Sequence, residues 1–280
     1  MAIKIHVMHT GKVCVSPYLP FGGENCNILK ASGLIVPKSK WLWLPVSVYL
    51  IEHPKGLILV DTGWGRDMSP DGVFDKKAQI RALGSRILYN VNQGVVEKGA
   101  AVHEQLAARG IKTSELDYVL MTHLDCDHAC GLQHVRDARS IMVAEEEIAF
   151  AHKNRFVRYQ KKWWDGINFD YVKWNGKEGP VGKSCDLFGD GSITLVNIPG
   201  HADGLFAIKV KNAEGKSALL FADGGYATKS WQKMILPGIS SDKAMQRQSL
   251  EWIREQSLSP QCITSIATHD TDVKPHIIEV

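Results

Sequence analysis

The stretch THLDCDHACGL, residues 122–132, holds the densest group of metal-binding side chains in the sequence and guides how the rest is interpreted. Two histidines and two aspartates lie within six residues, from His123 to His128, in the order H-x-D-x-D-H. Imidazole nitrogens and carboxylate oxygens bind zinc and comparable divalent ions. A tight turn directs its side chains to different sides, so the stretch could serve two ions. Taken alone, it fits a metal site and a polar surface turn equally well.

Composition restricts the class of protein. The chain has 280 residues, of which 44% are hydrophobic, and a net charge of only +3. We expect no nucleic-acid partner, because such proteins usually carry a concentrated basic stripe. The start, MAIKIHVMHTGKV, lacks the apolar run of a signal peptide, and no run approaches the ~18 apolar residues of a membrane span. We therefore expect a cytoplasmic protein, away from membranes, with six reduced cysteines.

Local patterns predict a mixture of strands and helices. VSVYLIEHPKGLILVDTG, residues 46–63, has the form of a β-hairpin. Residues 97–109 and 243–256 are predicted helices, and residues 64–93 are expected to form loops and short helix. The aromatic and basic run of residues 155–174 is interpreted as a helix with an aromatic core face and a solvated basic face. An acyl-chain, phosphate or nucleic-acid site is the alternative for this run.

Polar clusters follow four predicted strands. The strands YVLMT, SITLVNI, SALLFA and CITSIA, the last strand predicted, end close to His123, His201, Asp223 and His269 respectively. Functional residues of α/β proteins tend to lie in loops at strand ends, where a rigid sheet holds them. Four such clusters can converge on one point. The sequence therefore favours a metal site over a polar surface turn.

The order of these motifs resembles that of the metallo-β-lactamase superfamily. The elements that carry the resemblance are the H-x-D-x-D-H stretch, PGH at His201, D-x-x-Y from Asp223 to Tyr226, and a late THD at His269, with LVDTG around Asp61 before them. The resemblance spans roughly residues 44–270. It implies an αββα sandwich, and we expect residues 1–280 to form one domain. YLIEHPKGLILVDTG, LDYVLMTH and Tyr226 make the N-acyl homoserine lactonases the most similar branch.

The resemblance also implies a ligand set and a mechanism. One ion would be held by His123, residue 125 and His201, a second by Asp127, His128 and His269, and Asp223 would bridge them. The ions would convert water to hydroxide, which attacks a lactone carbonyl. Tyr226 would stabilise the oxyanion or protonate the leaving alkoxide, and Asp127 would take up a proton.

Asp125 departs from the superfamily pattern, which has histidine at this position. An additional negative charge would make the bridging water harder to deprotonate. Zinc is the expected metal, but carboxylate favours Fe²⁺ or Mn²⁺ more than imidazole does. Three outcomes stay open: Asp125 is a ligand, which we favour; the first metal has one protein ligand fewer; or the site holds a single metal.

Other residues near the motifs receive simpler interpretations. Cys126 and Cys130 are expected to pack in the turn rather than bind metal. Asp61 is expected to be a structural carboxylate beside the site. By analogy with the lactonases, Phe21 in the loop PYLPFGGENC is a candidate apolar wall of the substrate pocket.

The sequence thus predicts a metal-dependent hydrolase, a monomer or homodimer, that opens homoserine lactones or a related small lactone. The alternatives are a superfamily hydrolase of phosphodiesters or thioesters, and a metal-binding protein with little catalysis. Flavodiiron proteins also place a carboxylate at this position, but they carry a flavodoxin domain, and only about 10 residues follow His269 here. Fold alone does not decide among these functions.

Overall fold

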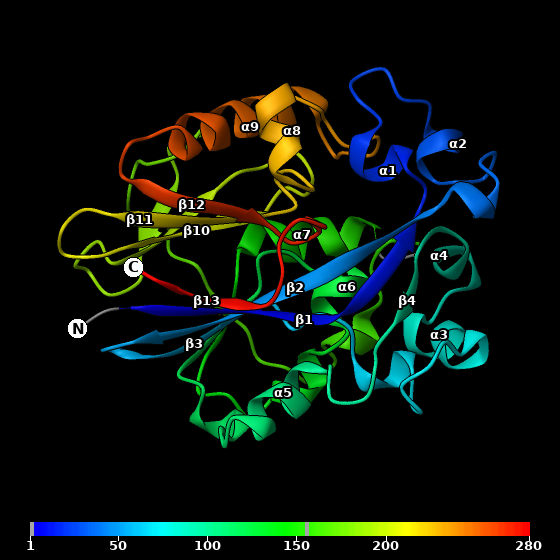
Figure 1. Ribbon diagram of the computed structural model, residues 1–280, viewed down its shortest axis with the longest axis horizontal. Coiled ribbons are helices and arrows are strands. Elements are labelled where there is room, and N and C mark those ends of the chain that lie inside the picture. Colours follow the sequence, from blue (N-terminus) through cyan, green and yellow to red (C-terminus); the bar gives the residue numbers. More distant parts are fainter. Residues whose placement is uncertain (1–2, 155–156) are drawn as a thin grey trace.

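The computed structural model describes residues 3–154 and 157–280. Two β-sheets pack face to face, with helices on both outer sides (Figure 1). This arrangement is the predicted αββα sandwich. In the described residues, no helix is long and apolar enough to cross a membrane.

The larger sheet is mixed and carries the first half of the chain. Its order is β13 (His276–Glu279), β1 (Lys4–Val15), β2 (Leu42–His53), β3 (Gly56–Val60), β5 (Tyr118–Leu120), β6 (Ile141–Val143) and β7 (Asp170–Tyr171), and β4 (Gln93–Val95) also pairs with β1. β2 and β3 form the predicted antiparallel hairpin. β13 lies beyond the strand that the sequence indicated as the last. It pairs with β1, so the two chain ends lie side by side (Figure 1).

The smaller sheet carries most of the second half. Its order is β12 (Cys262–Ala267), β11 (Ser217–Ala222), β10 (Phe206–Lys211), β9 (Ile193–Asn197) and β8 (Ser184–Asp186). The nine helices of the described residues are α1 (Tyr18–Phe21), α2 (Ile28–Ala31), α3 (Lys76–Leu83), α4 (Arg86–Val91), α5 (Val102–Ala108), α6 (Cys126–Ala129), α7 (Glu145–Asn154), α8 (Thr228–Lys233) and α9 (Lys243–Ser257). Figure 1 shows α8 and α9 outside the smaller sheet and α5 outside the larger one.

Both faces of the larger sheet are buried, as the alternating side chains of β2 show. In β2, Val48 and Leu50 belong to the core on the helix side, whereas Tyr49 and Ile51 belong to the core between the sheets. Successive side chains of a strand point to opposite faces. A strand that is covered on both faces therefore needs the nearly continuous apolar run that this segment has.

Two of the predicted helical segments differ from expectation. The helix predicted from residue 97 begins at Val102, because residues 97–100 form a turn in which Gly99 has a φ of 79°. Residues 155–174 do not form the predicted helix: residues 155 and 156 lie outside the described part, and the rest contains a turn, a 3-10 turn at Lys161–Trp163 and β7. Trp163 and Tyr159 are nevertheless buried in the core, as the aromatic residues suggested.

Strand direction explains why the polar clusters meet. β3 and β5 are parallel, so the segments that follow them leave the larger sheet at the same edge. In the smaller sheet β11 and β12 are parallel, and β9 runs in the same direction because β10 is antiparallel to both β9 and β11. The loops after these five strands carry the predicted site residues. The fold therefore brings the loops to one edge of the sandwich.

Candidate metal centre

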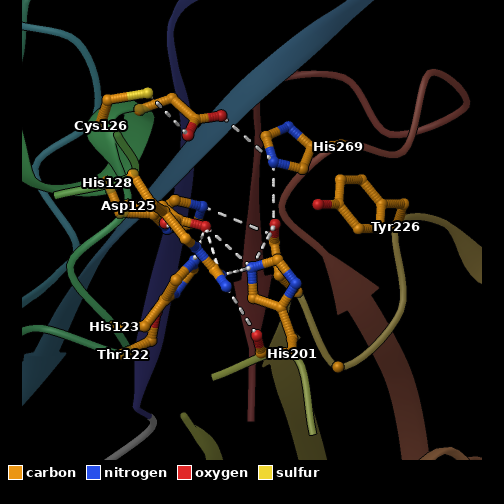
Figure 2. A network of polar contacts seen from close by, with 12 residues as sticks. Thr122, His123, Asp125, Cys126, His128, His201, Tyr226 and His269 are labelled. Carbon is orange, nitrogen blue, oxygen red and sulfur yellow. Dashed lines mark hydrogen bonds and ion pairs between the residues drawn. The ribbon is translucent and has the colours of Figure 1, made fainter. Parts of the chain in front are cut away.

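The seven predicted metal ligands lie together at this edge. Their ligand atoms form three overlapping groups, and within each group all atoms lie within 4.8 Å of one another. Figure 2 shows the four imidazoles turned toward a common centre. The groups are His123, Asp125 and His201; His123, His128 and Asp223; and Asp127, His128 and His269. These buried clusters are consistent with a two-metal centre.

Asp61 holds the motif turn in place. One carboxylate oxygen accepts a hydrogen bond from the Thr122 backbone N–H, and the other accepts from the Thr122 hydroxyl and from His128 Nδ1, each at 2.8 Å. Asp61 has a left-handed backbone with a φ of 57°, a conformation that costs energy for residues other than glycine. Both oxygens of the carboxylate thus accept hydrogen bonds from the turn, as expected of a structural residue.

Hydrogen bonds on the outer nitrogens fix the orientation of three histidines. His128 Nδ1 bonds to Asp61, His269 Nδ1 lies 2.8 Å from the carbonyl oxygen of Pro45, and His123 Nδ1 lies 3.0 Å from the Thr122 hydroxyl. Each of these partners can accept a hydrogen from Nδ1. The Nε2 lone pairs are then free to face the centre, which is how metal-binding histidines are usually held.

Unpartnered buried atoms test whether a metal fits. Nε2 of His123, Nε2 of His128 and Oδ1 of Asp223 are buried without a hydrogen-bond partner in the described structure. Buried polar groups are normally paired, because an unpaired one costs about 1–3 kcal/mol. Three unpaired ligand atoms at one point form a donor set that suits a divalent cation.

Asp223 lies in the middle of the cluster. Its Oδ1 is 3.3 Å from His269 Nε2 and 3.5 Å from His128 Nε2, and its Oδ2 is 3.7 Å from His201 Nε2. Burial opposes its charge, but His269 and His128 hold the pKa of the carboxyl well below its usual range. This central position is the one expected of a bridging ligand.

Asp127 and His269 complete the second ligand group. Asp127 Oδ2 lies 3.4 Å from His269 Nε2. Burial raises the pKa of Asp127, although His128 and His269 oppose the shift. For His128, burial disfavours the charged form, but Asp61 and Asp223 raise its pKa well above the usual range. Without a metal, a proton on this imidazole balances the carboxylates, and metal binding would release it.

Asp125 is bound to an arginine that the sequence did not single out. Arg158 Nε lies 2.6 Å from Asp125 Oδ1, and Arg158 Nη2 lies 2.8 Å from Asp125 Oδ2. The same Nη2 is 2.9 Å from His201 Nε2. The carboxylate expected to bind the first metal is therefore paired with a guanidinium. Arg158 lies in the aromatic and basic run of residues 155–174, where nothing in the spacing distinguished it from the neighbouring cations.

A cavity of about 280 Å³ opens onto this cluster. Most of its surface is apolar, and its walls come from β1, α1, α2 and α4 and from the loop before α9. The apolar lining includes Val13, Val15, Leu19, Ile28, Leu88, Val91 and Ile239. Phe21 is not among the lining residues: it faces a neighbouring depression, where the ammonium group of Lys229 lies 3.7 Å from its ring centroid. Leu19 and Ile28 from the same N-terminal segment form the wall predicted for Phe21.

Tyr226 forms one side of the cavity. Its ring stacks on His269, with 5.2 Å between centroids, and meets His201 edge-on at 6.0 Å. Figure 2 shows its hydroxyl end directed toward the metal-binding side chains. Burial, followed by the charges of Asp223 and Asp125, raises its pKa well above the usual value. The phenol therefore stays protonated at neutral pH and can donate a hydrogen bond.

The two cysteines of the motif lie outside the metal-binding groups found among the described residues. Cys126 is buried in the core on the helix side, and Cys130 packs against it. Burial and the nearby Asp127 raise the pKa of both thiols well above the usual value. Thiolate ligation is thus disfavoured, in agreement with the packing role predicted for both residues.

Curated relatives of this chain include N-acyl homoserine lactonases. The chain is 26% identical to AttM of Rhizobium radiobacter over 243 residues. These residues cover 82% of this chain and 83% of AttM. It is 23% identical over 239 residues to AiiA of Bacillus thuringiensis subsp. kurstaki, covering 85% and 86%.

Solved structures share the fold at lower identity. A variant of B. thuringiensis AiiA with N-decanoyl-L-homoserine bound at the active site matches with a TM-score of 0.73 and 20% identity, over 96% of this chain and 94% of that one. AidC, a dizinc quorum-quenching lactonase, matches with a TM-score of 0.63 and 14% identity, over 99% and 94%. The sequence profile of the metallo-beta-lactamase superfamily matches residues 41–215. With this match over more than half of its length, the chain belongs to the metallo-beta-lactamase superfamily.

Proposed function

We propose that the protein is a metal-dependent lactonase that opens the ring of an N-acyl homoserine lactone or a related small lactone, a quorum-quenching reaction. The observation that carries the proposal is that residues of the His and Asp cluster, together with Tyr226, line a largely apolar cavity. The relatives that act on acyl homoserine lactones support the same substrate class.

The metal would be held by the unpartnered Nε2 and carboxylate atoms described above. When bound, it supplies an activated water and polarises the substrate carbonyl. We propose zinc as the ion, with Fe²⁺ or Mn²⁺ as alternatives where carboxylate ligands dominate. The residues around the metal keep its ligands oriented: Asp61 and Pro45 fix the imidazoles of His128 and His269.

In this reaction Tyr226 would donate a proton or hydrogen bond, and Asp127 would accept a proton from water. Addition of water to the lactone carbonyl places negative charge on the carbonyl oxygen, and the C–O bond of the ring then breaks. The Tyr226 hydroxyl, protonated at neutral pH, can donate to that oxygen or to the departing ring oxygen. Asp127 lines the cavity and can accept the proton from the attacking water and pass it to the alkoxide. The products are a carboxylate, an alcohol and one released proton.

The electrostatics of the cavity favour a neutral substrate. Three carboxylates, those of Asp125, Asp127 and Asp223, line it. Arg158 is the one lysine or arginine among the described lining residues, and it is already paired with Asp125. With one divalent ion bound, the charges of the three carboxylates, Arg158 and the ion sum to zero, so the site offers no excess positive charge to a phosphodiester. A lactone is uncharged, and an acyl chain suits the apolar walls.

Acid release tests the proposal. Purified, zinc-loaded protein is assayed in a pH-stat against homoserine lactones with short and long acyl chains, a phosphodiester and a thioester. We expect the highest kcat/KM on an acyl homoserine lactone. Preferential turnover of the phosphodiester or thioester would contradict the lactonase assignment, and bound metal without turnover on the panel would favour a metal-binding role.

A further inference from the structure

The carboxylates in the two halves of the metal cluster are paired with different kinds of basic side chain. In the half formed by Asp127, His128, His269 and Asp223, the ion pairs of the carboxylates among the described residues are all with histidines. An imidazole nitrogen has a lone pair that can bind a metal, whereas a guanidinium has none to offer. In the half formed by His123, Asp125 and His201, Asp125 is paired with Arg158, which keeps its charge at any working pH.

Arg158 occupies the ligand atoms of this first half. Its Nε and Nη2 take both oxygens of Asp125 in a fork, at 2.6 and 2.8 Å. Nη2 also lies 2.9 Å from His201 Nε2, and Nη1 donates to the His201 carbonyl oxygen at 3.0 Å. An imidazole nitrogen has one position for a partner. Nε2 of His201 therefore interacts with either Arg158 Nη2 or Asp125 Oδ2, which also lies at 2.9 Å.

The guanidinium is held there by the core of the protein. Its carbon lies 5.4 Å from the ring centroid of Phe150 and 5.2 Å from that of Tyr159. The Tyr159 hydroxyl donates to Glu147 Oε1 at 3.2 Å, and the same oxygen accepts the backbone N–H of Leu124 at 2.9 Å. Glu147 thus connects the segment that carries Arg158 to the turn that carries Asp125. The ion pair is built into the fold, unlike a surface pair.

Few ligands remain for an ion in the first half. Nε2 of His123 is unpartnered, but Asp125 and His201 are engaged. A zinc site normally has three or four protein ligands. A divalent ion beside the guanidinium would also be repelled by it, and Asp125 offsets only one unit of charge.

We propose that Arg158 takes the place of the first metal ion, so that the protein holds one divalent ion, at Asp127, His128, His269 and Asp223. The inference rests on the proposed metal-dependent function and concerns how the same site is built. One Nη1–H of Arg158 has no partner among the described residues, and Arg158 lines the cavity. It can donate to a substrate oxygen without leaving Asp125. The guanidinium would then be a substrate-polarising cation as well as a replacement for a metal.

Metal stoichiometry tests this proposal without reference to activity. Wild type, Arg158→Ala and Arg247→Ala are stripped with a chelator, loaded with excess Zn²⁺, desalted and measured by elemental analysis and native mass spectrometry. Arg247 pairs with Glu24 on the surface and is the matched control. We expect one ion per chain in wild type and in Arg247→Ala, and two in Arg158→Ala, because Asp125 and His201 become available.

Asp125→His gives a second route if Arg158→Ala does not fold. This change removes the carboxylate that fixes the arginine and adds a ligand, so we again expect two ions per chain. Two ions in wild type would overturn the proposal, as would one ion in both folded variants. No bound ion in any form would overturn the proposed function as well. Lactone turnover with one ion per chain in every form would leave the proposed function intact and refute only the role of Arg158.

Discussion

At the scale of single residues, Tyr226 is the group whose role can be separated from metal binding. Its ring packs on His269 and His201, and its hydroxyl faces the cluster. Tyr226→Phe keeps the ring and removes the donor. We expect kcat on the lactone to fall roughly 10²-fold, the cost typical of losing an oxyanion donor or general acid. Metal content should not change.

Tyr171→Phe is the control, because Tyr171 is exposed on β7, away from the cavity lining. Steady-state kinetics on metal-analysed samples give the readout. Equal kcat in wild type and Tyr226→Phe would remove the hydroxyl from the reaction.

Glu147 makes stability depend on pH. Its side chain is fully buried, Oε2 has no partner, and burial raises its pKa from 4.5 to about 7. The folded state then holds this proton more tightly than the unfolded state. The associated stability is fully present below pH 4.5 and is lost as the pH rises through about 7. Glu147→Gln removes the titration.

Urea unfolding of metal-free protein between pH 5 and 8 measures this effect. Wild type should lose stability relative to Glu147→Gln as the pH rises, by on the order of 3 kcal/mol, since one pKa unit corresponds to about 1.4 kcal/mol. Glu145→Gln, at an exposed position of the same helix, should follow wild type. Parallel curves for wild type and Glu147→Gln would contradict the account.

The sequence indicated the unusual aspartate but not its partner. Asp125 was recognisable because it stands inside a dense motif. Arg158 lies 33 positions later, in a run with many other basic residues. Only the fold brings the two together, through the buried contacts of Tyr159 and Glu147. A contact of this kind has no local signature in one sequence.

At the scale of elements, the loop after β9 depends on a close approach to α9. Gly200 has a φ of 131°, and a Cβ there would lie 2.3 Å from the backbone of Gln246. Its carbonyl oxygen accepts from the Ser241 hydroxyl and from the Asp242 backbone N–H. These contacts place the neighbouring His201.

Gly200→Ala should therefore destabilise the protein by more than about 2 kcal/mol, through overpacking and backbone strain. Gly215→Ala is the control, because Gly215 also has a positive φ, 85°, but its Cβ would meet open space. Thermal unfolding compares the two. Equal losses would show that backbone conformation, rather than packing against α9, sets the cost.

Strands and their ends were predictable, whereas the segment after α7 was not. Apolar runs bounded by turn residues located β2, β3, β5, β9, β11 and β12, and strand direction then determined where their loops meet. Residues 155–174 contain aromatic residues at a spacing that also suits a helix. In the structure Tyr159, Trp163 and Trp164 are buried in the core although the backbone around them is irregular. The indole N–H of Trp163 donates to the Ala82 carbonyl oxygen. Tertiary packing overrides such local preferences.

At the scale of the whole molecule, the proposed metal site lies between the two sheets. The proposed ligands come from the loop after β5 in the larger sheet and from the loops after β11 and β12 in the smaller one. An ion that binds only the folded state adds about 2.7 kcal/mol of stability at 100 times its Kd. Removing zinc should lower Tm by about 5–10 °C. Calorimetry with and without chelator measures this shift, and an unchanged Tm would contradict binding between the sheets.

Metal-dependent lactone opening is the central claim, and one titration tests it most directly. Metal-free protein receives stepwise Zn²⁺ while acid release from an acyl homoserine lactone is followed, with His128→Ala in parallel. The account predicts no turnover without metal, a rise that saturates near one ion per chain in wild type, and no rise in the variant. Full turnover by the metal-free protein, or none at saturating zinc, would contradict it.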